Sequence, residues 1–407
     1  MSLSFRTNLR QEIPETTLGE DRARTVNQIL DNNENWKLEA QDVIKMLLKD
    51  MESKKASDID LGSASSDKKI WIRISGVKHP NLDVPEYNND EITSIVLSIL
   101  SSKQKKTLFA NKNIDFSIGL QLEEDEYAGK RSRFRGDVYF ETGIIVANFR
   151  RIGKELFPIE SLGFPQRIVR RLNLEHEKTG LNLVTGITGA GKSTTLDSII
   201  NMNNQSNEAH IVIISNPIEY LHSSNKCIIR HREVGSDVNS FREGTTQALR
   251  QDPDIIVVGE MRDPGTIATV LEATDSGHKV FSTLHTSSSI ETLHRIIAEF
   301  PPNEQTRIRY RLADTLKVII SQKLVPAKKG NLVLAKEILS MTSSVKAAIR
   351  NDNISEIFQM ISEGNKYGMI TMQQDLFKLY KKDIISKKAA ISYANNKRIM
   401  LQLLKVL

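Results

Sequence analysis

Apolar residues follow two different spacings in the first third of the chain. In residues 38–54 and 91–109 they recur every three to four positions, which predicts amphipathic helices. In residues 69–77 isoleucine alternates with other residue types, which predicts a half-buried strand. Further strands are expected at DFSIGL (115–120), RFRGDVYF (133–140) and GIIVANFRRI (143–152). Residues 36–156 are therefore predicted to form a mixed α+β domain with an antiparallel sheet.

The two segments that flank this domain lack such patterns. Residues 1–35 are polar, with clusters such as DNNEN, and are expected to form a poorly ordered or lightly helical extension. Residues 157–166 carry two prolines and few charges, as an interdomain linker does. A second domain is therefore predicted to begin after residue 166.

Beyond this linker the apolar residues form short continuous runs. These runs are rich in β-branched residues: LNLVTG (181–186), HIVIIS (210–215), DIIVVGE (254–260) and KVFSTLH (279–285). Helical spacing follows several of them, which indicates a parallel sheet buried on both faces. We predict an α/β domain over residues 167–340 and a helical region over 341–407, with one more strand pattern near 331–339.

Composition excludes several classes of protein. No apolar run approaches the roughly 20 residues of a membrane span, and the N-terminus lacks the apolar core of a secretory signal, so a cytoplasmic protein is expected. The single cysteine, Cys227, excludes an internal disulfide and a Cys-rich zinc site. The net charge of +6, spread over a long chain, is too dilute to indicate nucleic acid. An anionic membrane surface or an acidic partner stays open.

Residues 186–195, GITGAGKSTT, match the phosphate-binding pattern G-x-x-x-x-G-K-[ST] between a predicted strand and a predicted helix. The glycines let backbone N–H groups wrap around phosphate oxygens at a helix N-terminus. Lys192 is expected to bridge the β- and γ-phosphates, and Ser193 to ligate Mg²⁺. The predicted nucleotide-binding residues are Gly186, Thr188, Gly189, Ala190, Gly191, Lys192, Ser193 and Thr194.

A carboxylate is expected beside this loop. Glu260 follows four apolar residues of a predicted strand and so emerges at its carboxyl end, the edge where open α/β sheets bind ligands. We predict that Glu260 holds Mg²⁺ or polarises the attacking water.

Several stretches together resemble the hexameric secretion and pilus ATPases, and within them the pilus-retraction, twitching-motility branch. They are REVGSDVNSFREGTTQALRQDPDIIVVGEMRDPGTI (232–267), GHKVFSTLHTSSSIETLHRII (277–297), FPPNEQTRIRYRLADTLKVIISQKLVP (300–326), ASDIDL, DFSIGL and RFRGDVYFETG. The resemblance implies a PAS-like N-terminal domain followed by a RecA-like motor domain. It also implies a ring of six subunits, with Mg²⁺ and ATP held between the two domains.

The resemblance also implies catalytic roles for residues outside the phosphate loop. Arg133, Arg135 and Arg150 match arginines that reach toward the γ-phosphate, where a guanidinium neutralises developing charge. His278 and His285 match a His box, in which a histidine at a strand end reports the state of the γ-phosphate. Surface arginines and structural histidines are the alternatives.

The sequence departs from the family pattern at the Asp box. Ser215 and Asn216 replace an acidic pair, whereas Pro217, Glu219 and Tyr220 persist. Neither serine nor asparagine accepts a proton from water at neutral pH. Hydrolysis is therefore predicted to be slower than in typical relatives, with Glu219 or Glu260 partly substituting; a weakly hydrolysing regulatory subunit is the alternative.

Near the C-terminus, Ala348, Ile349, Arg350 and Asn351 reproduce the AIRN element that is associated with retraction. The segment that follows is shorter than usual, so a plasmid-transfer or type IV secretion role stays open.

The expected function is that of a ring ATPase whose Mg·ATP cycle moves its domains about the segment 157–166. Its expected partners are its own copies and a platform protein at the cytoplasmic face of the inner membrane, with peripheral membrane association open and no nucleic acid. A nucleotide kinase would need an acceptor pocket and a lid, and the domain with the RFR sequence that precedes the motor does not suggest either. A DNA translocase would need a basic, aromatic strand path, which 6% aromatic residues disfavour.

Overall fold

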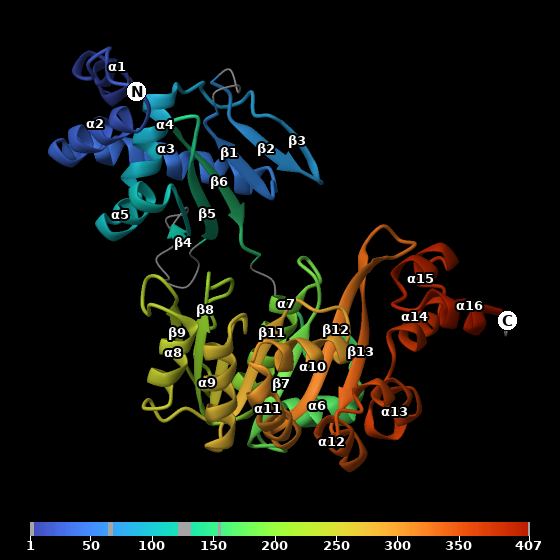
Figure 1. The fold of residues 1–407 in the computed structure, drawn as a ribbon. Helices are drawn as coiled ribbons and strands as arrows, with labels where there is room; N and C mark the ends of the chain where they lie inside the picture. The colour runs from blue at the N-terminus through green and yellow to red at the C-terminus, as the bar shows by residue number, and fades with distance from the viewer. Residues whose placement is uncertain (1–3, 64–67, 121–131, 154–155, 406–407) are drawn as a thin grey trace. The chain divides into compact units, whose positions relative to one another are not determined.

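The computed structural model describes residues 4–63, 68–120, 132–153 and 156–405 (Figure 1). The chain divides into two compact units, unit 1 over residues 1–154 and unit 2 over residues 155–407. Each unit is built around a single β-sheet.

Unit 1 contains a six-stranded antiparallel sheet with helices on one face (Figure 1). The strand order is β3-β2-β1-β6-β5-β4, which fits the predicted antiparallel α+β arrangement. The strands are β1 (Asp58–Leu61), β2 (Trp71–Ile74), β3 (Val77–Pro80), β4 (Asn113–Leu120), β5 (Ser132–Glu141) and β6 (Ile144–Arg151). The helices are α1 (Ser4–Glu12), α2 (Gly19–Asn32), α3 (Glu34–Ser53), α4 (Asn89–Ser98) and α5 (Ser102–Asn111). One helix was expected over 91–109; Ser101 instead caps α5 and separates it from α4.

The first 35 residues differ from the predicted polar extension. Within them α1 buries Phe5 and Leu9, and α2 buries Ala23, Val26 and Leu30, all in the core of unit 1. These apolar residues are few but lie three or four positions apart, so each helix has one narrow apolar stripe. The segment is therefore part of the domain.

Unit 2 contains a seven-stranded sheet of order β13-β12-β7-β11-β10-β8-β9. All neighbouring strands are parallel except β12 and β13, which pair antiparallel at one edge. The strands are β7 (Gly180–Thr185), β8 (His210–Ser215), β9 (Ile228–Glu233), β10 (Ile255–Val258), β11 (Lys279–Leu284), β12 (Leu316–Pro326) and β13 (Leu332–Ser340). The sequence pattern predicted β7, β8, β10, β11 and β13, and missed β9 and β12.

Helices cover both faces of this sheet, and separate apolar clusters fill the two sides. The helices are α6 (Gln166–Leu172), α7 (Lys192–Ser206), α8 (Phe241–Ala248), α9 (Pro264–Asp275), α10 (Ser289–Ala298), α11 (Pro302–Thr315), α12 (Ser343–Arg350), α13 (Ile357–Glu363), α14 (Met372–Lys381), α15 (Lys387–Tyr393) and α16 (Lys397–Lys405). Short 3₁₀ turns occur at η1 (Ile159–Leu162), η2 (Ile354–Glu356) and η3 (Gly364–Tyr367).

The segment predicted as a linker, 157–166, is packed rather than free. Ile159 of η1 and Phe164 are buried in the same cluster as α6 and α7 of unit 2. Its two prolines flank η1 and start α6, so they shape a packed turn. Among the described residues, no helix combines the length and apolar character that crossing a bilayer requires.

Candidate nucleotide site

The phosphate-binding loop connects β7 to α7, as its sequence context predicts. Gly186 is buried, and a Cβ there would lie 2.7 Å from the Gln322 carbonyl oxygen and 2.7 Å from the Ala190 Cβ. Gly191 has a φ of +82° at the N-terminus of α7, a conformation that a side chain disfavours. Both glycines are therefore required by the path of the loop.

Gln322 of β12 fixes the loop through two side-chain hydrogen bonds, and the sequence analysis did not predict this role. Its amide nitrogen donates to the Ala190 carbonyl at 2.7 Å, and its amide oxygen accepts from the Thr195 hydroxyl at 3.0 Å. The side chain is buried, so both bonds are shielded from water. Because β12 was not predicted, no local signal pointed to this residue.

Three side chains that follow neighbouring strands form a chain of polar contacts at the carboxyl edge of the sheet. The Lys192 ammonium donates to the Gly186 carbonyl at 2.9 Å and lies 3.4 Å from His285 Nδ1. His285 Nε2 lies 3.2 Å from Glu260 Oε1, which also pairs with Arg262 Nε at 2.6 Å. Since β7, β11 and β10 are adjacent and parallel, their carboxyl ends bring these residues together.

Burial and the nearby Lys192 charge lower the pKa of His285, although Glu260 opposes them. The neutral ring is therefore favoured, with Nδ1 accepting from Lys192 and the Nε2–H donating to Glu260. Burial also lowers the pKa of Lys192, and the charges of Glu260 and Glu219 act in the other direction. The site thus couples one ammonium electrostatically to two carboxylates.

The altered Asp box lies beside the strand that carries Glu260. Ser215 ends β8, and a Cβ on Gly259 would lie 3.0 Å from its hydroxyl oxygen. That hydroxyl donates to the Pro217 carbonyl at 3.1 Å, whereas Asn216 and Glu219 are exposed. A carboxylate at position 215 would therefore border the residue before Glu260.

The structure does not bring His278 to this cluster, which corrects the prediction of a catalytic role. His278 precedes β11 and His285 follows it, so they lie at opposite ends of a six-residue strand, roughly 20 Å apart. His278 Nδ1 instead contacts the Ala273 carbonyl at 3.1 Å and the Ser276 hydroxyl at 3.0 Å. Its contacts are those of a turn residue.

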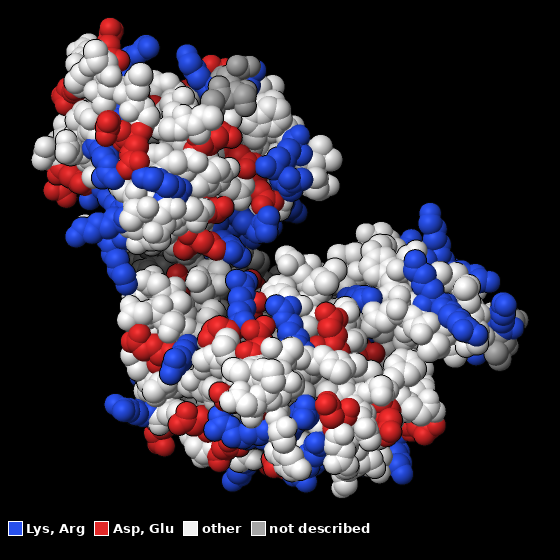
Figure 2. Space-filling view, viewed as in Figure 1, with Lys and Arg blue, Asp and Glu red and all other residues white. Residues whose placement is uncertain are grey.

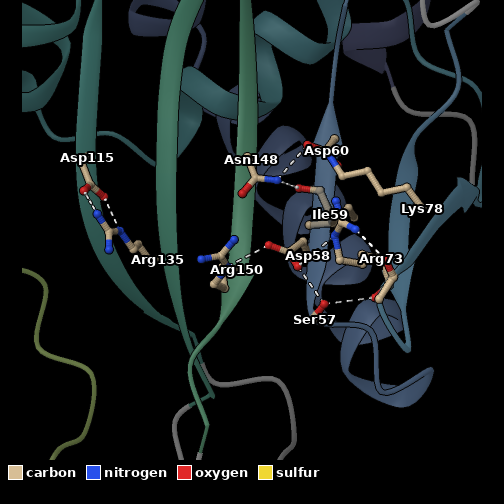
Figure 3. A network of polar contacts seen from close by, with 11 residues as sticks. Ser57, Asp58, Ile59, Asp60, Arg73, Lys78, Asp115, Arg135, Asn148 and Arg150 are labelled. Atoms are coloured by element: carbon tan, nitrogen blue, oxygen red, sulfur yellow. Dashed lines mark hydrogen bonds and ion pairs between the residues drawn. The ribbon is translucent and has the colours of Figure 1, made fainter. Parts of the chain in front are cut away.

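Of the predicted arginines of unit 1, Arg135 and Arg150 lie on the sheet face that carries polar side chains (Figure 3). Arg133 lies two residues before Arg135 on β5 and so shares its face. The register sets Arg73, Asp58, Arg150 and Arg135 side by side on four strands. Asp58 is buried and accepts from Arg150 Nε at 2.8 Å, and Arg73 Nε lies 3.7 Å from its other oxygen. The terminal part of Arg150 faces outward, since 65% of the side chain is exposed.

The other two arginines are held differently. Arg135 engages both oxygens of Asp115, with Nε at 3.0 Å from Oδ1, and Arg133 Nη2 donates to the Ser117 hydroxyl. Burial raises the pKa of Asp58, but hydrogen bonds from Ser57 and Arg150 and the charges of Arg150 and Arg73 outweigh it, so the net pKa lies below its ordinary value. Asp58 and Asp115 were not predicted from the sequence as partners of these arginines.

A family model described as Type II/IV secretion system protein matches residues 37–397, most of the chain. The chain belongs to this family. A twitching motility protein of Neisseria gonorrhoeae is 36% identical over 330 residues, covering 81% of this chain and 85% of its own length. The type IV pilus retractation ATPase PilT of Pseudomonas aeruginosa is 36% identical over 336 residues, covering 82% and 93%.

Solved structures of family members share the fold. A crystal structure of the pilus retraction motor PilT with bound ADP matches with a TM-score of 0.78 and 36% identity, over 88% of this chain and 99% of that one. The ATPase DotB of Legionella pneumophila matches with a TM-score of 0.68 and 25% identity, over 86% and 94%. The chain is therefore a PilT-like secretion ATPase with an N-terminal domain and a RecA-like motor domain, which confirms the predicted fold and enzyme class.

The AIRN element of this family member lies at the end of α12. Ala348 and Ile349 are buried in the core of unit 2. Arg350 pairs with Asp314, and its guanidinium carbon lies 5.8 Å from the Tyr310 ring. Asn351 ends the helix, its backbone N–H donating to the Ala347 carbonyl at 2.9 Å. Two of the four residues thus have packing roles, whereas Arg350 is partly exposed and Asn351 is exposed.

Proposed function

We propose that this chain is the motor of type IV pilus retraction, which hydrolyses ATP as a ring of six at the cytoplasmic face of the inner membrane. Its similarity to a twitching motility protein and to a retraction ATPase supports this choice. The observation that carries the catalytic part is the contact chain Lys192–His285–Glu260 beside the phosphate-binding loop. A membrane-embedded platform protein is the proposed partner.

In this proposal the Lys192 ammonium turns from the Gly186 carbonyl to the β- and γ-phosphate oxygens of ATP. The backbone N–H groups of residues 188–194 surround the phosphates at the N-terminus of α7. Glu260 orients and polarises the attacking water, and His285 transmits the loss of the γ-phosphate from Lys192 to Glu260.

Mg²⁺ is the proposed metal. Nucleotide-bound Mg²⁺ takes most of its ligands from phosphates and water, so one or two protein oxygens are enough. The Ser193 hydroxyl, next to Lys192 in the first turn of α7, and the Glu260 carboxylate are oxygen donors of the required kind. Among the described residues no cluster of three or more His, Cys, Asp or Glu side chains could hold a metal by itself. The bound ion would neutralise charge on the phosphates.

Arg150 is the arginine of the three whose terminal nitrogens are least engaged by the described partners. Asp58 accepts a hydrogen bond from the Arg150 Nε, and the two terminal nitrogens of Arg150 face outward. Arg135 would first have to leave Asp115, which engages it through two nitrogens. We therefore assign Arg150 the leading role and Arg133 and Arg135 supporting roles.

A second candidate function is that of a weakly hydrolysing regulatory subunit in a mixed ring. It is favoured by Ser215, whose hydroxyl borders Gly259 where relatives are expected to place a carboxylate. Slow turnover by an active motor is our preferred reading, because the phosphate loop and Glu260 are intact.

Retraction is tested in the organism that carries this chain by replacing Lys192 with alanine at the native locus. We expect surface pili to accumulate and twitching to stop, because pili would assemble without being withdrawn. Normal twitching with a loss of secretion or plasmid transfer would instead support those roles of the family.

A further inference from the structure

The positive charge of the chain is concentrated at one place, which corrects the expectation that it is spread. Residues 372–405, which form α14–α16, contain eight Lys and Arg against two Asp. Their surplus of six equals the +6 of the whole chain. The remaining residues hold 48 Lys and Arg and 48 Asp and Glu, since the totals are 56 and 50.

All eight basic side chains are exposed, and Figure 2 shows Lys and Arg along the surface formed by these helices. They are Lys378, Lys381, Lys382, Lys387, Lys388, Lys397, Arg398 and Lys405. No ion pair joins any of them to another residue that the structure describes. The two acidic residues do not neutralise them, because Asp375 is buried beside Lys336 and Asp383 pairs with Lys328.

These side chains stand on a folded lobe and not on a loose tail. Met372, Leu376, Ala390, Met400 and Leu404 form an apolar cluster with Val325 of β12 and Ala335 of β13. Thr371 and Ser386 cap α14 and α15 through hydrogen bonds to backbone N–H groups. The charges therefore keep fixed positions on one small domain.

The lobe also offers apolar surface next to its charges. A cleft of about 360 Å³ runs between α14, β13 and the turn at Leu162, lined by Val333, Leu379 and Ile384 and bordered by Lys378 and Lys382. Leu401 of α16 is 43% exposed. Basic side chains beside apolar ones suit an interface of phosphate head groups over acyl chains.

We propose that α14–α16 form a lobe that binds the anionic phospholipid surface of a membrane. The alternative is an acidic protein surface, for which a central cluster of exposed aromatic anchors would be expected. Among the described residues of α14–α16, the one large apolar side chain with high exposure is Leu401. The inference extends the membrane location proposed above and does not depend on ATP turnover.

The electrostatic part of such binding is large enough to measure. Each Lys or Arg near an anionic bilayer contributes about fivefold in affinity. Removing four charges is therefore expected to weaken binding by on the order of a hundredfold or more. Because salt screens these contacts, binding should fall steeply as ionic strength rises.

The test is sedimentation of the full chain with vesicles of phosphatidylglycerol and phosphatidylcholine, and with phosphatidylcholine alone. The lobe variant replaces Lys387, Lys388, Lys397 and Arg398 with glutamine. The matched control replaces Lys49, Lys106, Lys178 and Lys226, which are also exposed and lie outside the lobe. Both variants have the same net charge.

We expect the wild type and the control variant to bind the anionic vesicles, and the lobe variant to lose binding with unchanged phosphate release. A Lys192→Ala chain should bind like the wild type, which separates this inference from the proposed motor function. Equal losses in the lobe and control variants would overturn the proposal, since net charge alone would then explain binding. An absence of binding by the wild type would also overturn it and favour an acidic protein partner.

Discussion

We expect Ser215 to limit the rate of ATP turnover. A glutamate there would border Gly259, the residue before Glu260, and could accept a proton from the attacking water. We expect Ser215→Glu to raise kcat by about tenfold or more with a small change in KM. Ser215→Gln is the control of similar size without a base, and equal kcat values for the two variants would remove the altered Asp box from the explanation.

Asp58 is expected to support ATP hydrolysis by holding Arg150 in a fixed orientation. Asp58→Asn keeps the shape but loses the charge that fixes Arg150 Nε, so kcat should fall about five- to tenfold for roughly 1 kcal/mol of lost orientation. The same change in an Arg150→Ala background should have little further effect. Additive losses in this double-mutant cycle would mean that Asp58 acts only on the stability of unit 1.

Site residues inside one sequence motif were predicted better than site residues contributed by a distant strand. Gly186, Lys192 and Ser193 lie within one short motif whose spacing fixes their geometry. Gln322 is 130 residues from Lys192 and reaches the loop only because β12 pairs with β7. His278 could have been placed correctly from the sequence, because the six residues of β11 separate it from His285.

At the scale of elements, α2 is a structural part of unit 1. Leu30 is fully buried against the core, so Leu30→Ala should reduce the free energy of unfolding by about 2–5 kcal/mol. Leu38 in α3 is 51% exposed, and the same substitution there should cost less than about 0.5 kcal/mol. Denaturant unfolding measures both, and similar small losses would support the original expectation of a polar extension.

The first residue of β11 is a buried lysine, Lys279, whose protonation opposes folding. Burial lowers the pKa of Lys279 to about 7, and its nitrogen donates to the Arg171 carbonyl at 2.7 Å and the Glu177 carbonyl at 2.6 Å. Above pH 7 and below the ordinary lysine pKa, the unfolded chain holds a proton that the folded chain has released. The free energy of unfolding should therefore rise with pH by on the order of 1 kcal/mol per unit between about 7 and 10.

Lys279→Met removes this titration and keeps the volume of the side chain. We expect the stability of the variant to change less with pH than that of the wild type over the same range, as measured by denaturant unfolding at several pH values. Parallel pH profiles for the two proteins would contradict the lowered pKa.

The pattern of apolar residues predicted some elements better than others. The runs at β7, β8, β10 and β11 are short, β-branched and followed by helices, so the parallel sheet was predictable. The strand β12 directly follows the helical pattern of α11 without a turn signal, since α11 ends at Thr315 and β12 begins at Leu316. The segments 1–35 and 157–166 were misjudged because a few buried side chains hold each of them in place.

For the whole molecule, the residues proposed to act on ATP come from both units. Unit 1 supplies Arg150, and unit 2 supplies Lys192, Glu260 and His285. Family membership shows that the chain is a secretion ATPase. The partner that this motor moves is a proposal.

The central claim is that Lys192, His285 and Glu260 form a working hydrolytic site. The most direct measurement is steady-state phosphate release from Mg·ATP by the full chain, beside Lys192→Ala and Glu260→Gln, with ATP binding and oligomer mass recorded in the same buffer. We predict turnover by a hexamer, abolished by both substitutions, with ATP binding kept by Glu260→Gln. Tight ATP binding by the wild type with no more phosphate release than in the two variants would contradict the claim and make the chain a regulatory subunit.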